Sequence, residues 1–173
     1  TSKLPEPRYF ADAITADHAI LSDKEKSRHG RSVSLVIQDR ATYWLQAYAC
    51  KTKNAEETKA GFLRFLGPDT KPKHVYTDGS GEFEKALKEL GFLHDTSTPY
   101  RPETNGIAER AVRRTSEGIS CVLKQSGLTE DWWPEAMSCF CFHRNIQDVA
   151  ASGLRPWDAR FKAKFQGPRI PFG

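Results

Sequence analysis

The spacing of hydrophobic residues changes along the chain, from a strand-like period in the first third to a helical period in most of the remainder. The strand-like runs are separated by short polar turns, one of them around Gly30. They cover residues 9–21, 32–38 and 42–50, with two shorter runs at 74–77 and 92–96. Helical periodicity is found over residues 54–66, 83–90, 104–125 and 132–145.

The order of these elements predicts a mixed sheet. Three antiparallel strands in succession form a meander, and the two later strands alternate with helices. This order predicts an α/β fold of the ribonuclease H-like type, with a five-stranded sheet flanked by helices. Asn54 is expected to cap the first helix, and Gly91 and Gly127 to end the second and third. Residues 98–105, with Pro99 and Pro102, are expected to form a polar loop.

The length of 173 residues favours one domain with a single core. We interpret residues 1–8 as a linker, 9–150 as the core and 151–173 as its carboxy-terminal extension. The chain opens on Thr1 without an initiator Met, so we expect it to be a segment of a longer protein.

Composition and charge narrow the class of protein. A hydrophobic content of 38% with 28% charged residues is ordinary for a soluble globular domain. The formal net charge of +4 is compatible with a polyanionic partner. No apolar stretch reaches the roughly 18 residues of a membrane helix, so no membrane association is expected. The four cysteines lack the paired spacing of a zinc site and are interpreted as reduced, partly buried thiols.

Three acids stand out by their positions. Asp17 lies among apolar residues of the first strand, where a carboxylate costs free energy unless a metal ion or another partner compensates it. Asp78 follows the fourth strand, at the kind of strand end where α/β sheets bind ligands. Glu109 lies one turn inside the long helix predicted over 104–125. Three carboxylates suit Mg²⁺ or Mn²⁺, and two such ions about 3.5–4 Å apart support phosphoryl transfer.

Each acid also has a structural interpretation. Asp78-Gly79 is a common turn pair, and Glu109 has the i,i+4 spacing for an ion pair with Arg113. Asp12 or Asp39, rather than Asp17, could be the acid of the first strands. His18 alternates to the other face of its strand from Asp17 and is not expected to be a ligand.

Two longer motifs carry a family resemblance. Tyr76-Thr-Asp-Gly-Ser-Gly-Glu-Phe83 resembles the Thr-Asp-Asn-Gly-x-x-Phe box of retroviral and retrotransposon integrases. Residues 97–110, Ser-Thr-Pro-Tyr-Arg-Pro-Glu-Thr-Asn-Gly-Ile-Ala-Glu-Arg, resemble their Pro-Tyr-x-Pro-Gln-x-Asn-Gly-x-x-Glu-Arg signature. The segment 14–18 also looks like the family's first-strand aspartate. The resemblance covers about residues 9–148 and is closest to the polyproteins of long-terminal-repeat retrotransposons.

This resemblance implies an integrase catalytic core whose acid triad falls on Asp17, Asp78 and Glu109. It implies two reactions, trimming of the element's DNA ends and attack of the freed 3′-hydroxyl on target DNA. Mg²⁺ or Mn²⁺ would be the cofactor, as two ions. DNA and further copies of the chain would be the partners, and the nucleus the site of action.

The same resemblance places DNA contacts at Tyr100 and Asn105 in the loop and at Arg113 on the helix. Arg110 and Arg114 are added by their helical spacing, since i, i+3 and i+4 positions share a face that could contact phosphates. The alternative is a solvated basic face. Trp132, Trp133, Phe140 and Phe142 are interpreted as core or dimer packing rather than as base-stacking residues.

The chain also departs from the family pattern. Thirty residues separate Asp78 from Glu109, where the family usually has 35. Gly79-Ser80 replaces Asn-Gly, and Glu103 replaces a common Gln. Two alternative functions therefore stay open. One is a ribonuclease H-like nuclease with the same metal chemistry, and the other is a captured or decayed core that binds DNA or protein without catalysis.

Overall fold

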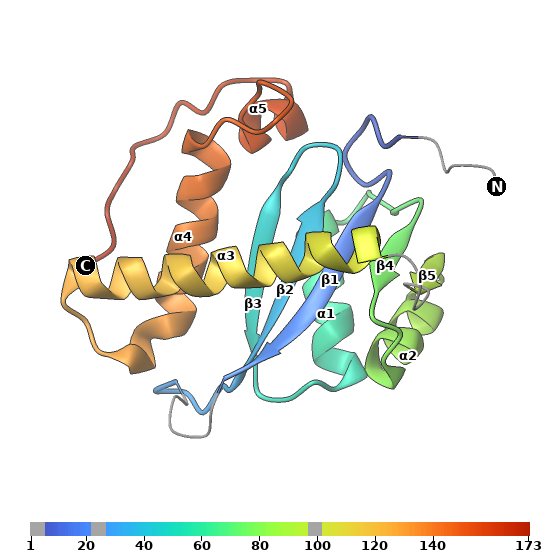
Figure 1. Cartoon of the computed structure of the whole chain (residues 1–173), viewed down its shortest axis with the longest axis horizontal. Helices are drawn as coiled ribbons and strands as arrows, with labels where there is room; N and C mark the ends of the chain where they lie inside the picture. Colours follow the sequence, from blue (N-terminus) through green and yellow to red (C-terminus); the bar gives the residue numbers. More distant parts are fainter. Residues whose placement is uncertain (1–5, 22–26, 97–101) are drawn as a thin grey trace.

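A central five-stranded sheet, with strand order β3-β2-β1-β4-β5, is covered by helices on both faces (Figure 1). The computed structural model describes residues 6–21, 27–96 and 102–173. The strands are β1 (Ile14–Ile20), β2 (Val33–Asp39), β3 (Leu45–Cys50), β4 (Val75–Thr77) and β5 (His94–Thr96). The helices are α1 (Ala55–Leu66), α2 (Gly81–Leu90), α3 (Pro102–Ser126), the 3₁₀ turn η2 (Glu130–Trp132), α4 (Trp133–Gln147) and α5 (Pro156–Phe161). The predicted fold class and element order are confirmed.

The sheet is antiparallel on one side of β1 and parallel on the other. β1 pairs antiparallel with β2, and β2 with β3, which forms the predicted meander. β4 pairs parallel with β1 on its other side, and β5 with β4. Because a parallel neighbour requires a crossover, α1 and α2 connect these later strands and cover one face of the sheet.

Two hydrophobic clusters, one on each face of the sheet, form the core. One joins the strands to α1 and α2 through Ile14, Leu35, Phe62, Phe65 and Phe83. The other joins them to α3 and α4 through residues Val36, Leu45, Ala111, Trp133 and Met137. Every residue of β2 is buried, since both of its faces are covered. The predicted packing role of Trp133 is confirmed, and Trp132 and Phe140 lie against the same cluster.

Helix ends follow the sequence signals closely. The Asn54 side chain accepts a hydrogen bond from the Glu57 backbone N–H at 2.8 Å, as expected of a cap. Gly91 ends α2 in the left-handed region with φ of 69°, a conformation that glycine adopts without strain.

Three predicted boundaries were wrong. β1 begins at Ile14 rather than near Tyr9, because residues 9–13 turn and Ala11 has a φ of 70°. β3 begins at Leu45 rather than Thr42, because the Asp39 carboxylate accepts hydrogen bonds from Thr42 and holds that residue in the turn. α3 begins at Pro102, so Glu109 lies two turns inside it rather than one, and residues 102–105 are helical rather than loop.

The four cysteines are free. Burial raises the pKa of the Cys141 thiol to about 12, so it stays protonated and behaves as a small apolar side chain. In the part of the chain that the structure describes, no helix combines the length and apolarity that crossing a membrane requires.

Candidate metal and nucleic-acid site

Asp17 is a half-buried carboxylate in the middle of β1, on the face that α3 covers. It lies opposite Val36 of β2, so the two side chains share a face of the sheet. Val36 packs in the cluster with Ala111 of α3. The Asp17 Oδ1 accepts a hydrogen bond from the His18 backbone N–H at 2.8 Å.

Asp78 comes next to Asp17 through the register of the parallel strands. β1 and β4 pair Ile14 with Val75 and Thr15 with Tyr76. The same register carried two residues further sets Asp17 beside Asp78, and adjacent strands lie about 4.8 Å apart. The Asp78 side chain is exposed, and its Oδ1 accepts a hydrogen bond from the Ser80 backbone N–H at 3.0 Å, so it also shapes the turn.

Glu109 lies on α3, the helix that covers the same face of the sheet as Asp17. α3 packs across β1 and β2, with Ala111 buried against the sheet two residues after Glu109. Glu109 is exposed, and within the described ranges it forms no ion pair with Arg113 or any other residue. The structural interpretation of Glu109 as the partner of Arg113 is therefore not supported by an ion pair.

The electrostatics connect the three acids. Burial raises the pKa of Asp17, and the hydrogen bond from the His18 N–H opposes that rise. The negative charges of Asp78 and Glu109 each raise the pKa of Asp17 further, while the positive charge of Lys53 lowers it. Asp78 and Glu109 thus lie close enough to Asp17 for their charges to act on it, a destabilising arrangement that a cation would relieve.

The two rival acids of the first strands are engaged elsewhere. Asp39 is fully buried, and its carboxylate accepts hydrogen bonds from the Ala11 N–H at 2.8 Å and from the Thr42 N–H and hydroxyl at 2.7 and 2.8 Å. Asp12 pairs with Lys73 at 2.8 Å, which with backbone hydrogen bonds lowers the pKa of Asp12 to about 2. Both carboxylates fix turns, which leaves Asp17 as the one of the three that faces other acids.

His18 points away from these acids. Its ring stacks on Phe83 with centroids 4.4 Å apart and lies 3.3 Å from the Thr58 hydroxyl, between α1 and α2. Burial is the main cause that lowers the pKa of His18, to about 4, so the ring is neutral at pH 7. This placement agrees with its assignment to the opposite strand face.

Comparison with solved structures identifies the fold. The catalytic core domain of BIV integrase superposes with a TM-score of 0.65 over 88% of this chain and 95% of that one, at 17% identity. The HTLV-2 integrase catalytic core, solved with magnesium in a trimeric form, gives 0.65 over 88% and 97% at 20% identity. A simian T-cell lymphotropic virus intasome, solved with a PP2A regulatory subunit, gives 0.68 over 99% and 62% at 20% identity. The chain has the fold of a retroviral integrase catalytic core.

The integrase-like core is also similar in sequence to plant retrotransposon proteins. It is 28% identical over 125 residues to the Pol polyprotein of transposon TNT 1-94 from Nicotiana tabacum, a match covering 68% of this chain. It is 30% identical over 112 residues to that of transposon RE2 from Arabidopsis thaliana, covering 60%. The matches span 9% and 8% of those polyproteins. No protein-family model matches the chain. The resemblance predicted from the two motifs is confirmed.

The structure describes the side chains of only three of the residues predicted to contact DNA, Arg110, Arg113 and Arg114. Tyr100 lies outside the described residues, and Asn105 is described only as part of the helical backbone of α3. Arg110 and Arg114 line a cavity together with Arg40 and Arg144, whereas Arg113 does not. The cavity therefore includes two of the three helix arginines. Sequence analysis did not associate Arg40 and Arg144 with this cavity, because no local pattern relates a strand turn to the end of a distant helix.

We expect Asp17→Asn to stabilise the metal-free protein at pH 7 by about 1 kcal/mol, or about 2–4 °C in Tm. Because the pKa of Asp17 is raised above its usual value of 3.8, the folded protein holds the Asp17 proton more tightly than the unfolded chain does. The stability that comes from this proton is fully present below pH 3.8 and is lost as the pH rises through the pKa of the folded state. The difference between variant and wild type should therefore grow from pH 4 to pH 7. Thermal melts in EDTA at several pH values measure it. A variant equally or less stable at pH 7 would contradict the cost of burying the Asp17 charge and the repulsion by Asp78 and Glu109 described above.

Proposed function

We propose that this chain is an integrase catalytic core that performs divalent-metal-dependent processing of DNA 3′-ends and their transfer to target DNA. The observation that carries the proposal is geometric: the β1–β4 register sets Asp17 beside Asp78, and α3 with Glu109 packs on the same strands, so that the charges of Asp78 and Glu109 act on half-buried Asp17. Catalytic and metal-binding roles for these three acids are part of the proposal, and the integrase fold and motifs support it.

The donor set fits Mg²⁺ or Mn²⁺, because carboxylate oxygens are the ligands that these hard cations prefer. Within the described ranges, no three His, Cys, Asp or Glu side chains are already arranged around one point as a metal site. Binding would draw the three carboxylates inward, and the gain would include relief of the repulsion on Asp17. When bound, two such ions activate an attacking oxygen and stabilise a leaving oxygen.

The protein residues have separable tasks in this scheme. β1 and β4 hold Asp17 and Asp78 at neighbouring positions of a rigid sheet, which fixes one side of the site. α3 forms the other side of the site and carries Glu109. Arg113 follows one turn further along α3, where its positive charge would contact a phosphate of the DNA end. The hydrogen bond from the His18 N–H to Asp17 orients that carboxylate.

Disintegration of a branched DNA oligonucleotide, the reversal of strand transfer, tests the proposal, because we expect an isolated integrase core to perform it. We expect strand-joining products with Mn²⁺ or Mg²⁺, and none in EDTA. Cleavage of an RNA–DNA hybrid without action on branched DNA would favour the ribonuclease H-like alternative. Metal binding and a folded protein with no activity on either substrate would favour the non-catalytic alternative.

The wider role of the core is also part of the proposal. Multimer formation is supported by the trimeric form of the HTLV-2 core and by the intasome that contains the simian virus chain. Element DNA and target DNA as partners, and action in the nucleus, follow from the integrase function proposed above. Size-exclusion chromatography with light scattering would measure the multimer directly, and a monomer at all concentrations would contradict it.

A further inference from the structure

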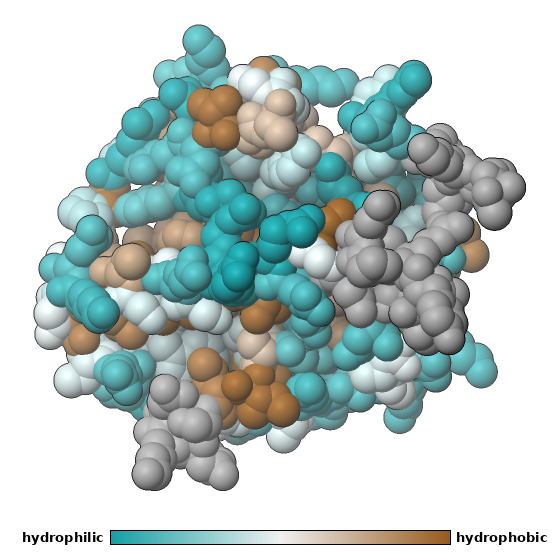
Figure 2. Space-filling model, in the orientation of Figure 1, coloured by the Kyte–Doolittle hydropathy of each residue, from teal (hydrophilic) through white to brown (hydrophobic). Residues whose placement is uncertain are grey.

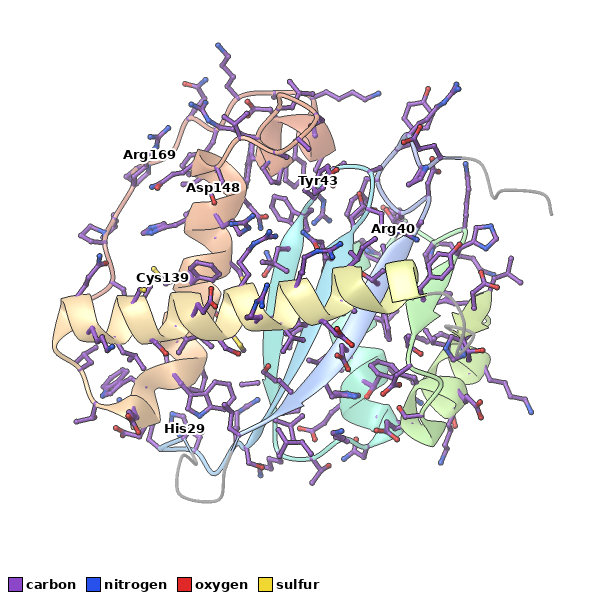
Figure 3. The ribbon with its side chains drawn as sticks, in the orientation of Figure 1. His29, Arg40, Tyr43, Cys139, Asp148 and Arg169 are labelled. Carbon is purple, nitrogen blue, oxygen red and sulfur yellow. The ribbon has the colours of Figure 1, made fainter. Side chains whose placement is uncertain are left out.

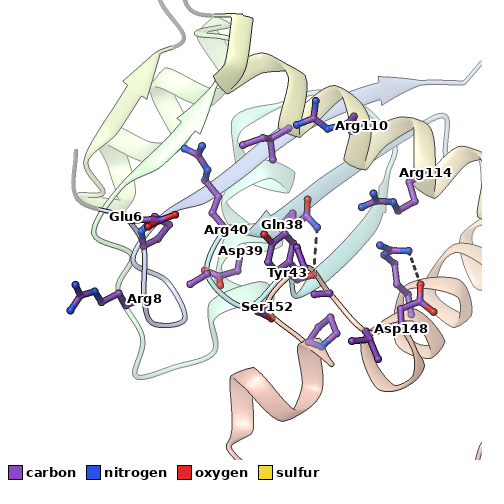
Figure 4. Close-up of a pocket in the computed structure, with 18 residues that line it drawn as sticks. Glu6, Arg8, Gln38, Asp39, Arg40, Tyr43, Arg110, Arg114, Asp148 and Ser152 are labelled. Carbon is purple, nitrogen blue, oxygen red and sulfur yellow. Dashed lines mark hydrogen bonds and ion pairs between the residues drawn. The ribbon is translucent and has the colours of Figure 1, made fainter. Parts of the chain in front are cut away.

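A cavity of about 780 Å³ lies on the side of α3 that faces the β2–β3 turn (Figure 4). It is lined by residues 107–114 of α3, by residues 38–43 of the turn, by the end of α4 with the loop that follows it, and by residues 6–8. Arg40 and Tyr43 stand on the turn, and Asp148 at the end of α4 (Figure 3). Neither Asp17, Asp78 nor Glu109 lines this cavity, so it is separate from the three acids.

Arg8 lies at one end of this cavity, which we call the arginine pocket, and four further arginine side chains from three elements line it. They are Arg40 on the turn, Arg110 and Arg114 on α3, and Arg144 on α4. Arg40 points from the turn toward α3 (Figure 4). Gly106, one helical turn before Arg110, leaves room for its guanidinium, since a Cβ there would lie 3.1 Å from Nη1. Figure 2 shows a strongly hydrophilic band over this part of the surface.

The acids that line the arginine pocket do not neutralise it. The Asp39 carboxylate is occupied by donors from Ala11 and Thr42. Asp148 pairs with Arg144 at 2.7 Å and so compensates one arginine. Glu6 lies with Arg8 at the other end of the cavity from Arg114 (Figure 4). Across the described ranges of the chain, Arg40, Arg110 and Arg114 have no ion-pair partner.

Arg114 and Arg144 are close enough for the charge of one to act on the other. Burial lowers the pKa of the Arg144 guanidinium, and the positive charge of Arg114 lowers it further, against the effect of Asp148. Like charges held together in a partly desolvated cavity cost free energy, which a bound anion would recover. Guanidinium groups match phosphate oxygens with paired N–H donors, so several of them in one cavity favour phosphate in particular.

We propose that the arginine pocket is a second phosphate-binding site, which holds backbone phosphates of a DNA strand away from the three acids. The inference rests on the proposed function, because that function is the reason for naming DNA as the source of the phosphates. The pocket is too large for one phosphate ion, and an open cavity with several cations suits successive phosphates of one strand.

The position of α3 sets the length of DNA that would be involved. A helix with its side chains is about 10–12 Å across, and phosphates of one strand advance about 3.4 Å per nucleotide along a duplex. A strand that passes from the Glu109 side of α3 to the arginine pocket therefore spans about three nucleotides or more. DNA long enough to reach both sides should bind more tightly than a fragment that reaches only the acids.

Salt-dependent DNA binding tests the proposal without catalysis. We would measure fluorescence anisotropy of a labelled duplex in EDTA for wild type and for Arg110→Gln/Arg114→Gln. We expect about tenfold weaker binding at 50 mM salt. The slope of log affinity against log salt should become shallower by about 0.9 for each phosphate that the variant no longer neutralises. Lys88→Gln, which removes an exposed charge on α2, is the matched control and should leave the slope unchanged.

A second measurement protects the test against a folding artefact. Inorganic phosphate should raise the Tm of wild type and of Lys88→Gln, and fail to raise that of the double variant, while all three have similar melts without phosphate.

Equal salt slopes for the double variant and the control would overturn the proposal. Pocket-dependent binding of polyglutamate with unchanged DNA binding would also overturn it, in favour of an acidic protein partner. Because EDTA prevents turnover, a failed disintegration assay with an altered salt slope would overturn only the catalytic proposal.

Discussion

Glu109→Gln is expected to reduce disintegration of branched DNA at least about 100-fold in Mg²⁺ or Mn²⁺. Loss of one carboxylate ligand weakens metal stabilisation of the transition state by several kcal/mol, and each 1.36 kcal/mol is tenfold in rate. The fold should be unaffected, because Glu109 is exposed and makes no ion pair with any described residue. Initial rates of product formation, with thermal melts of both proteins, measure the effect.

The matched control is Glu117→Gln, which removes another exposed carboxylate two turns further along α3. We expect its rate to stay within about twofold of wild type, since surface changes away from a site have small effects. Equal losses in the two variants would indicate a general effect of charge on DNA binding. Full activity in Glu109→Gln would remove Glu109 from the proposed metal-binding set.

Asp39→Ala is expected to have the largest effect on stability, a loss of about 3 kcal/mol and about 6–12 °C in Tm. The substitution leaves the buried N–H groups of Ala11 and Thr42 and the Thr42 hydroxyl without their acceptor. These bonds join the turn before β1 to the turn after β2, so both turns should loosen together. Urea unfolding followed by circular dichroism measures the loss.

Asp39→Asn separates the two halves of this network. The amide can keep one acceptor oxygen for Ala11, but its NH₂ group cannot accept from Thr42. We therefore expect a smaller loss than with alanine. A stability equal to wild type in both variants would show that the turns are held by other contacts. Recovery of lost activity in either variant at a higher concentration of divalent metal would instead point to a ligand role for Asp39.

Local sequence patterns predicted most of the secondary structure, because the relevant interactions lie within a few residues. The Asn54 cap and the glycine at 91 act through hydrogen bonds and backbone conformations that span at most one helical turn. The boundaries that failed depend on longer contacts. The late start of β3 results from the Asp39 carboxylate, and the late start of β1 from a turn at Ala11 bound to that same side chain.

The three candidate acids were also found from sequence, but the signal for Asp17 left other acids open. Asp78 and Glu109 lie in ordered motifs whose residues are contiguous, so a pattern of letters is enough to single them out. Asp17 had rivals in Asp12 and Asp39, since all three are acids near the ends or middle of early strands. The structure separates them by their partners, because hydrogen bonds and an ion pair occupy Asp12 and Asp39 and the charges of the other two acids act on Asp17.

The sequence by itself determined the order of strands and helices, the integrase-like motifs and the identity of the candidate acids, since periodicity, capping and contiguous motifs are local properties. Only the tertiary structure decided which arginines share a surface. Arg110 and Arg114 share a helix face with each other. Arg40 and Arg144 lie near them because α3 packs on β2 and on α4. Contacts between residues so far apart in the chain depend on how whole elements pack, and no periodicity of one segment encodes that packing.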